Sequence, residues 1–282
     1  MPELAEVEVV RLGLEPLIVG QTISSVSATG LRSVRRATSP QDFERRLTGA
    51  TVVSLDRWGK YLILNLQDAC GADACLVHLR MSGQLLWRSR DAEQIKHTHV
   101  RVSFEANDNE LQFVDPRTFG EMFLATSQDL VDLAKRLGPD PFTLVGGVFD
   151  IERFVERVRA TRAQIKPLLL SQKLVAGIGN IYADEILWRA KVRPWREANT
   201  LSKPKAGEIA GLILSVLSEA VAAGGSTLGD GQYVGVDGAA GSYQDHHEVH
   251  AREGQACRRC GREIEKFVVG GRGTYVCRSC QK

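Results

Sequence analysis

Four cysteines near the C-terminus constrain the fold of this 282-residue chain more than any other feature. They form two pairs with sixteen residues between them, Cys257-x2-Cys260 and Cys277-x2-Cys280. Each pair presents two thiolates to one ion, and two pairs complete a tetrahedral zinc site with no open position for catalysis. We therefore predict one structural Zn²⁺ that holds a small hairpin together. Its strands are expected at 266–270 and 274–276, with Arg272 at the tip of the turn.

Composition and charge indicate a soluble globular protein with local affinity for a polyanion. A hydrophobic content of 43% is enough for one or two ordinary cores, and no stretch approaches the ~18 apolar residues that a membrane span requires. We expect no membrane association and a cytoplasmic location. The net charge is only +2, yet residues 151–173 hold six Lys and Arg against two Glu, and residues 257–282 hold seven against two. These segments are typical either of a nucleic-acid footprint or of solvated helix faces.

The hydrophobic periodicity predicts a multidomain α+β fold. Residues 3–19 have the period of a helix, and residues 51–126 alternate as strands do, which favours a β-sandwich. A Pro- and Gly-containing linker follows at 138–150, and helical patterns then recur at 151–162, 167–175, 181–191 and 204–223. We predict a helix and β-sandwich domain at 1–137, a helical domain at 151–250 that includes a Gly-rich loop at 224–247, and the zinc ribbon at 251–282.

The N-terminal sequence Met1-Pro2-Glu3 is a candidate nucleophilic site. A small residue after the initiator normally allows Met1 to be removed, which leaves Pro2 with a free secondary amine. Terminal amines titrate near ~7.7, so at neutral pH roughly a fifth of such groups are uncharged and able to attack a sugar or carbonyl carbon. Glu3 is placed to act as the acid or base. The alternative is structural, with Pro2 in the first turn of a helix and Glu3 at its positive end.

Several separate strings of the chain resemble one family. They are MPELAEVE at the N-terminus, RWGKYL around Lys60, HLRMSG around Met81, VDPRTFG from Val114, IKPLLL around Lys166, GIGNIYADE from Gly177, and the final four-cysteine ribbon. In this order they resemble the bacterial formamidopyrimidine-DNA glycosylases, essentially from end to end. The resemblance implies an N-terminal helix on a β-sandwich, a helix-two-turn-helix domain and a C-terminal zinc finger.

The resemblance also implies a mechanism. Pro2 would attack C1′ of a damaged nucleotide, expel the base and form a Schiff base, with Glu3 assisting proton transfer. Elimination of the 3′ and 5′ phosphates would follow, so the expected function is a bifunctional glycosylase and abasic-site lyase. Lys60 and Arg272 match proton-donating or phosphate-contacting positions. The expected partner is double-stranded DNA with 8-oxoguanine, formamidopyrimidines or abasic sites, bound by a monomer.

Further DNA contacts are implied by the same resemblance. Met81, Arg117 and Phe119 match a triplet that fills the space left by an extruded nucleotide, whose removal from the stack costs a few kcal/mol. From the residues alone, Met81 and Phe119 would be interpreted as core side chains. Lys166 and His99 match DNA-contacting positions, as does Asn180, which opens a predicted helix and is alternatively a plain N-cap. Glu6 matches a residue of the active-site helix, or is an exposed helix carboxylate.

Departures from the family pattern leave the preferred lesion open. Ala5 stands where a second Pro is usual, Arg80 where Gly is usual, and His250-Ala251 where Tyr-Gly is common, and residues 242–247 differ from the usual lesion-covering segment. The alternatives are an endonuclease VIII-type glycosylase for oxidised pyrimidines and a non-catalytic protein that binds damaged DNA. Leu4 and the DPRxFG string favour the purine branch, and Pro2, Glu3 and Lys60 together favour an enzyme.

Overall fold

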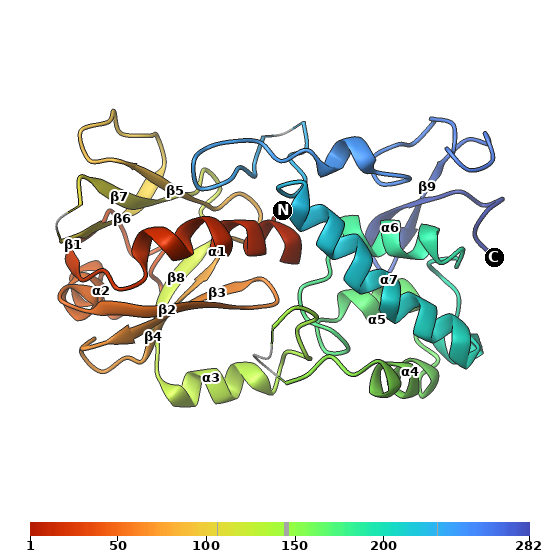
Figure 1. Cartoon of the computed structure of the whole chain (residues 1–282), viewed down its shortest axis with the longest axis horizontal. Coiled ribbons are helices and arrows are strands. Elements are labelled where there is room, and N and C mark those ends of the chain that lie inside the picture. The colour runs from red at the N-terminus through yellow and green to blue at the C-terminus, as the bar shows by residue number, and fades with distance from the viewer. Residues whose placement is uncertain (106, 144–146, 230) are drawn as a thin grey trace. The chain divides into compact units, whose positions relative to one another are not determined.

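The chain forms two compact units in a computed structural model that describes residues 1–105, 107–143, 147–229 and 231–282 (Figure 1). The first unit comprises Met1–Lys135 and Ala223–Ser242, and the second comprises Arg136–Ala222 and Tyr243–Lys282.

The first unit is built on two four-stranded antiparallel sheets, ordered β1-β6-β7-β5 and β2-β3-β4-β8, whose facing apolar residues share one core. Successive side chains of a strand point to opposite faces of its sheet, so every second residue of a strand faces this core. The elements of this unit are α1 (Leu4–Ile18), β1 (Ile23–Ala28), α2 (Pro40–Leu47), β2 (Thr51–Trp58), β3 (Tyr61–Gln67), β4 (Ala74–His78), β5 (Gln84–Ser89), β6 (Thr98–Phe104), β7 (Asn109–Val114), β8 (Glu121–Ala125) and α3 (Ser127–Ala134).

Helix α1 is attached to this core both by apolar packing and by an ion pair. Val7, Val10 and Leu14 are buried at the helical spacing that the sequence predicts. Arg57 of β2 has a fully buried side chain, and its Nε donates to Oε2 of Glu8 at 2.6 Å. The same guanidinium donates to the carbonyl of Gly59 at 3.0 Å. Because a buried charge is costly without a partner, this pair fixes how α1 lies on the sheet.

The second unit is mainly helical. Its elements are α4 (Ile151–Arg159), α5 (Ile165–Leu170), α6 (Asn180–Arg189), η1 (Ala198–Thr200), α7 (Lys203–Ala222), η2 (Tyr243–His246), β9 (Glu265–Val269) and β10 (Arg272–Val276). The helix predicted at 167–175 is shorter than expected. Gln172 has φ +61°, which ends the helical geometry, and its amide instead donates to the carbonyls of Leu170 and Ile178.

The ribbon hairpin corrects the predicted place of Arg272. Strands β9 and β10 pair antiparallel, with Val269 opposite Arg272, so the turn consists of Gly270 and Gly271 alone. Both glycines have positive φ, +57° and +74°, as a two-residue type I′ hairpin requires. Arg272 is therefore the first residue of a strand, not the tip of the turn.

The Gly-rich segment belongs to the first unit over residues 223–242, although the sequence analysis groups 224–247 with the helices. The backbone N–H of Trp87 donates to the carbonyl of Val236 at 2.8 Å, and Gln84 donates to the carbonyl of Gln232 at 3.3 Å. A Cβ on Gly13 of α1 would lie 2.7 Å from the Val236 side chain. The segment thus packs against both β5 and α1.

Replacing Glu8 with Gln is expected to lower the free energy of unfolding by about 3 kcal/mol, because the buried Arg57 charge loses its anionic partner. Urea denaturation measures the change. Glu15→Gln is the matched control, since Glu15 lies on the same helix and pairs with Arg11 at 3.0 Å with a side chain that is 46% exposed. That control should shift stability by less than about 0.5 kcal/mol. Equal losses in the two variants would show that the buried pair has no special role.

Candidate active site

The start of α1 is a buried and tightly hydrogen-bonded segment. Pro2 is buried, and Glu3, which is 2% exposed, is the N-cap of the helix. Glu6 accepts from the backbone N–H of Glu3 at 2.8 Å through Oε2 and from that of Ser226 at 2.8 Å through Oε1. The interpretation of Glu6 as an exposed carboxylate is therefore wrong. Its burial fixes the N-terminal residues against the Gly-rich segment.

Lys60 lies in a two-residue turn between β2 and β3, where Trp58 pairs with Tyr61. Gly59 supplies the positive φ of +59° in this turn, and Lys60 itself is only 9% exposed. Burial, followed by the nearby cations of Arg80 and Lys60, lowers the pKa of His78 to about 3. The His78 ring is thus neutral at neutral pH, and its Nδ1 accepts the backbone N–H of Arg80 at 3.0 Å.

Two adjacent loops present the predicted void-filling side chains to solvent. Met81 is 37% exposed and Phe119 is 44% exposed, so the interpretation of these residues as core is wrong. The Arg117 guanidinium carbon lies 5.1 Å from the centre of the Phe119 ring, so the two side chains point to the same side. Arg80 adopts φ +55°, the conformation that a Gly at this position would take readily.

His99 lies on β6, and its Nε2 is 2.9 Å from the carbonyl oxygen of Asp115. Its side chain is half-buried. The histidine therefore supports the strand end from which the Arg117 loop departs.

In the second unit, Asn180 is the first residue of α6, and Gly179 is the N-cap. The alternative interpretation of Asn180 as a plain N-cap is therefore wrong. Its Nδ2 donates to the carbonyl of Gly273 at 2.8 Å, while its buried Oδ1 has no partner among the described residues. The N-terminus of a helix is the positive end of its dipole, which suits an anion.

Lys166, which the sequence analysis expects to contact DNA, has its observed partners inside the second unit. Lys166 and Asp184 are both fully buried, and their Nζ and Oδ1 atoms are 2.7 Å apart. Nζ also donates to Thr274 Oγ1 at 2.8 Å and to the Gly273 carbonyl at 3.1 Å. Because its hydrogen bonds are directed into the interior, Lys166 ties α5 and α6 to β10. It thereby positions the ribbon.

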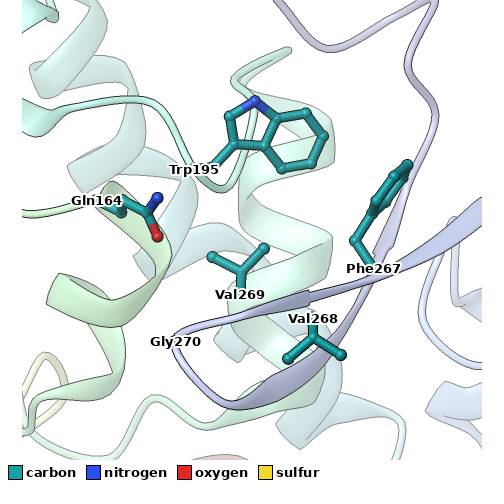
Figure 2. Close-up of a pocket in the computed structure, with 6 residues that line it drawn as sticks. All are labelled: Gln164, Trp195, Phe267, Val268, Val269 and Gly270. Carbon is teal, nitrogen blue, oxygen red and sulfur yellow. The ribbon is translucent and has the colours of Figure 1, made fainter.

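Arg272, by contrast, is exposed at the start of β10. The adjoining turn packs closely on α5, since a Cβ on Gly270 would lie 2.7 Å from Cγ of Pro167. A cavity of about 380 Å³ flanks this turn (Figure 2). Figure 2 shows Trp195 and Phe267 among its lining residues. Their ring centres lie 5.2 Å apart in an edge-on arrangement. These contacts hold Arg272 on a rigid hairpin.

The four predicted zinc ligands come together. The sulfur atoms of Cys257, Cys260, Cys277 and Cys280 all lie within 4.8 Å of one another, and all six cysteines are free of disulfides. A tetrahedron with ~2.3 Å Zn–S bonds has edges of roughly 3.8 Å, which this thiol set fits. The site holds one structural zinc ion.

Sequence reasoning missed the acids that hold these segments in place. Asp184 and Glu185 lie within the quoted string GIGNIYADE, and Asp115 lies within VDPRTFG, but none was assigned a role. All three are fully buried. The available signal was that each of these short acidic stretches adjoins apolar residues. An acid in such a place is almost never fully buried unless it is paired.

Comparison with known proteins places the whole chain in one family. Residues 1–122 match the formamidopyrimidine-DNA glycosylase N-terminal domain, residues 137–231 match the formamidopyrimidine-DNA glycosylase H2TH domain, and residues 254–282 match the zinc finger found in FPG and IleRS. The chain belongs to the formamidopyrimidine-DNA glycosylase family.

Individual members of this family resemble the chain over its full length. The formamidopyrimidine-DNA glycosylase of Acaryochloris marina is 41% identical, with 100% of this chain and 99% of that protein covered. Lactococcus lactis Fpg in complex with abasic-site DNA is 38% identical, with a TM-score of 0.88 and 99% of each chain covered. The same enzyme with DNA that contains N7-benzyl-Fapy-dG is 39% identical, with a TM-score of 0.88 and 100% of each chain covered.

Within the residues that the structure describes, no helix is both long and apolar enough to span a bilayer.

The first unit is expected to lose stability as the pH falls below about 6.5, because unfolding lets His78 take up a proton that the folded state excludes. His78→Asn keeps an acceptor for the Arg80 N–H but cannot titrate. It should reduce the stability lost between pH 6.5 and 5 by roughly 1–2 kcal/mol in urea titrations at each pH.

His97→Asn, at an exposed position with φ +68°, is the control and should retain the wild-type pH dependence. Part of the slope will persist in both variants, since burial also lowers the pKa of His247 to about 3. An identical slope in wild type and His78→Asn would contradict the assignment.

Proposed function

We propose that this chain is a bifunctional DNA glycosylase and abasic-site lyase of base excision repair that removes oxidised purines. The observation that carries the proposal is the buried Pro2-Glu3 start of α1 in a chain that matches the glycosylase family from end to end. The named relatives are formamidopyrimidine-DNA glycosylases, and the similar solved structures hold abasic-site or Fapy-dG DNA. The protein acts as a monomer on double-stranded DNA in the bacterial cytoplasm.

In the proposed reaction, removal of Met1 frees the secondary amine of Pro2, which attacks C1′ of the damaged nucleotide. The bond from C1′ to the base breaks and the base leaves with a proton. The C1′–O4′ bond of the sugar ring then breaks as O4′ takes a proton, which leaves the opened sugar as an iminium ion on Pro2. Glu3 donates and accepts protons at the opened sugar. Loss of a proton from C2′ expels the 3′ phosphate, and loss of a proton from C4′ expels the 5′ phosphate, so that the strand is cut on both sides.

The remaining side chains bind and shape the DNA. Met81 and Phe119 fill the space left by the extruded nucleotide, and Arg117 hydrogen-bonds the unpaired base opposite. Their exposure on adjacent loops supports this role. Lys60 and Arg272 serve the phosphates and proton transfer at the lesion, Asn180 with the N-terminus of α6 binds the backbone beside it, and His99 supports the Arg117 loop. Zinc keeps the ribbon folded and takes no part in the chemistry.

We also propose the domain boundaries set by the sequence, with the catalytic domain at 1–137, the linker at 138–150, the helical domain at 151–250 and the zinc finger at 251–282. Residues 223–242 are the exception, because their contacts lie with the first unit. We propose that this segment covers the extruded base, because it lies beside Glu6 at the start of α1.

Borohydride trapping tests the chemistry. The protein should form a reduced adduct with duplexes that contain 8-oxoguanine opposite cytosine, and Pro2→Gly should cut the adduct by roughly 10²-fold. Glu3→Gln should slow base release by about 10²-fold, the usual effect of a general acid or base. Glu15→Gln, on the same helix, should behave as wild type.

A preference for a duplex with an oxidised pyrimidine would move the chain to the endonuclease VIII type. Tight binding without any adduct, in protein whose mass confirms the loss of Met1, would leave a non-catalytic damage-binding protein.

Salt titrations separate a phosphate contact from a buried positioning role. On a duplex with an uncleavable tetrahydrofuran site, Arg272→Gln should reduce the slope of log Kd against log salt by about one. Lys166→Met should weaken binding about tenfold at every salt concentration with an unchanged slope, since no phosphate contact is lost. A reduced slope for Lys166→Met would instead support a direct contact between Lys166 and DNA.

A further inference from the structure

The loops that carry Met81 and Phe119 cross from one sheet of the sandwich to the other. The first runs from β4 to β5 and the second from β7 to β8. At one end His78 pairs with Glu121, and at the other end Gln84 pairs with Val114, so the two loops run antiparallel side by side. Between these ends no strand ladder joins them. Their relative position must therefore come from side chains.

A buried carboxylate joins the loops on the inner side. Asp115 is fully buried, and its Oδ1 accepts from Ser82 Oγ of the Met81 loop at 2.5 Å. The same carboxylate accepts from the backbone N–H groups of the other loop, at 3.2 Å from Arg117 and at 2.7 Å from Gly120. Ser82 and Gly120 directly follow Met81 and Phe119. One carboxylate thus holds the residue that follows each exposed side chain.

A second carboxylate joins the loops on the outer side. Glu121 is 3% exposed, and it pairs with Arg80 at 3.3 Å and with Arg35 at 3.3 Å. Arg35 also donates from Nη2 to the carbonyl of Phe119 at 3.0 Å. Arg36 completes the cluster at 3.1 Å. Although burial opposes ionisation, the three guanidinium groups outweigh it and hold the pKa of Glu121 below its ordinary value.

We propose that Glu121 and Asp115 are positioning residues that lock the two loops into one rigid wedge. The wedge then enters the duplex without first having to order its parts, which lowers the cost of holding the nucleotide outside the stack. This inference rests on the proposed function, because it assumes that Met81 and Phe119 enter DNA. It assigns no chemical step to either carboxylate.

The strongest test compares a paired lesion with a nucleotide that is already unpaired. Glu121→Gln removes the charge but keeps the size of the side chain. Single-turnover base release from an 8-oxoguanine·cytosine pair should fall about tenfold, the effect expected when charge-assisted hydrogen bonds are weakened. Cleavage of an abasic site inside a three-nucleotide bubble should change by at most about twofold. Stopped-flow fluorescence of 2-aminopurine next to the lesion should show tenfold slower insertion.

Glu110→Gln is the matched control. Glu110 is also a buried glutamate of the same unit, 2% exposed and paired with Arg101 at 2.6 Å, but it lies on β7 away from both loops. It should leave both substrates within about twofold of wild type. An equal loss on paired and unpaired substrates in Glu121→Gln, or no loss on either, would overturn the proposal.

A second variant covers a failure of Glu121→Gln to fold. Arg35→Gln removes the links to the Phe119 carbonyl and to Glu121, together with a local bond to the Arg32 carbonyl. Arg32→Gln, at an exposed neighbouring position, is its control. Arg35→Gln should lower base release from the paired lesion about threefold to fivefold and spare the bubble substrate. If wild-type protein cleaves the bubble substrate and Arg35→Gln matches it on the paired lesion, the wedge proposal fails alone. If wild-type protein cleaves neither substrate, the proposed function fails as well.

Discussion

Buried backbone must find hydrogen-bond partners, and in this protein carboxylates supply them where functional segments leave regular structure. Glu6 accepts the N–H groups of Glu3 and Ser226 at the start of α1. In the second unit, Glu185 accepts three successive N–H groups, those of residues 248, 249 and 250, at 2.8 to 3.0 Å. A carboxylate suits this task because it has about four acceptor sites and no donor. Segments without a strand partner are thereby given fixed positions.

The cost of burying these acids explains why the held segments are rigid. Burial raises the pKa of Glu185 even though its three N–H donors act in the opposite direction. Breaking such a set leaves a buried group with unmet hydrogen bonds, which costs more than each bond contributes while it is made. The Lys166–Asp184 pair follows the same logic, since either residue alone would be an uncompensated charge. The ribbon that carries Arg272 is therefore restrained at its base as well as at its zinc site.

Sequence reasoning predicted those features that depend on local periodicity or on ligand chemistry. The spacing of Cys257 to Cys280 predicted the metal site, and alternation predicted the sandwich strands, because both patterns follow from short-range geometry. The burial of Lys166 was not predictable, since a lysine in a short helix is normally solvated and its partners lie 18 and 108 residues away. The second ribbon strand was predicted to begin at 274 but begins at Arg272. The four residues Gly270-Gly271-Arg272-Gly273 did not show which two of them would form the turn with positive φ. The Gly-rich segment was grouped by chain order, whereas its contacts are set by Glu6 and β5.

Backbone strain lies next to the side chains that are proposed to enter DNA. Arg80 and Thr118 each adopt φ +55°, and each directly precedes an exposed apolar residue, Met81 or Phe119. A left-handed conformation costs a residue with a Cβ roughly 1–2 kcal/mol, and a β-branched threonine adopts it rarely. Such conformations persist only where the surroundings determine them, and here those surroundings are Asp115 and Glu121. The loops are therefore held in geometries that they would leave if released, which is what a preformed wedge requires and a merely flexible loop does not.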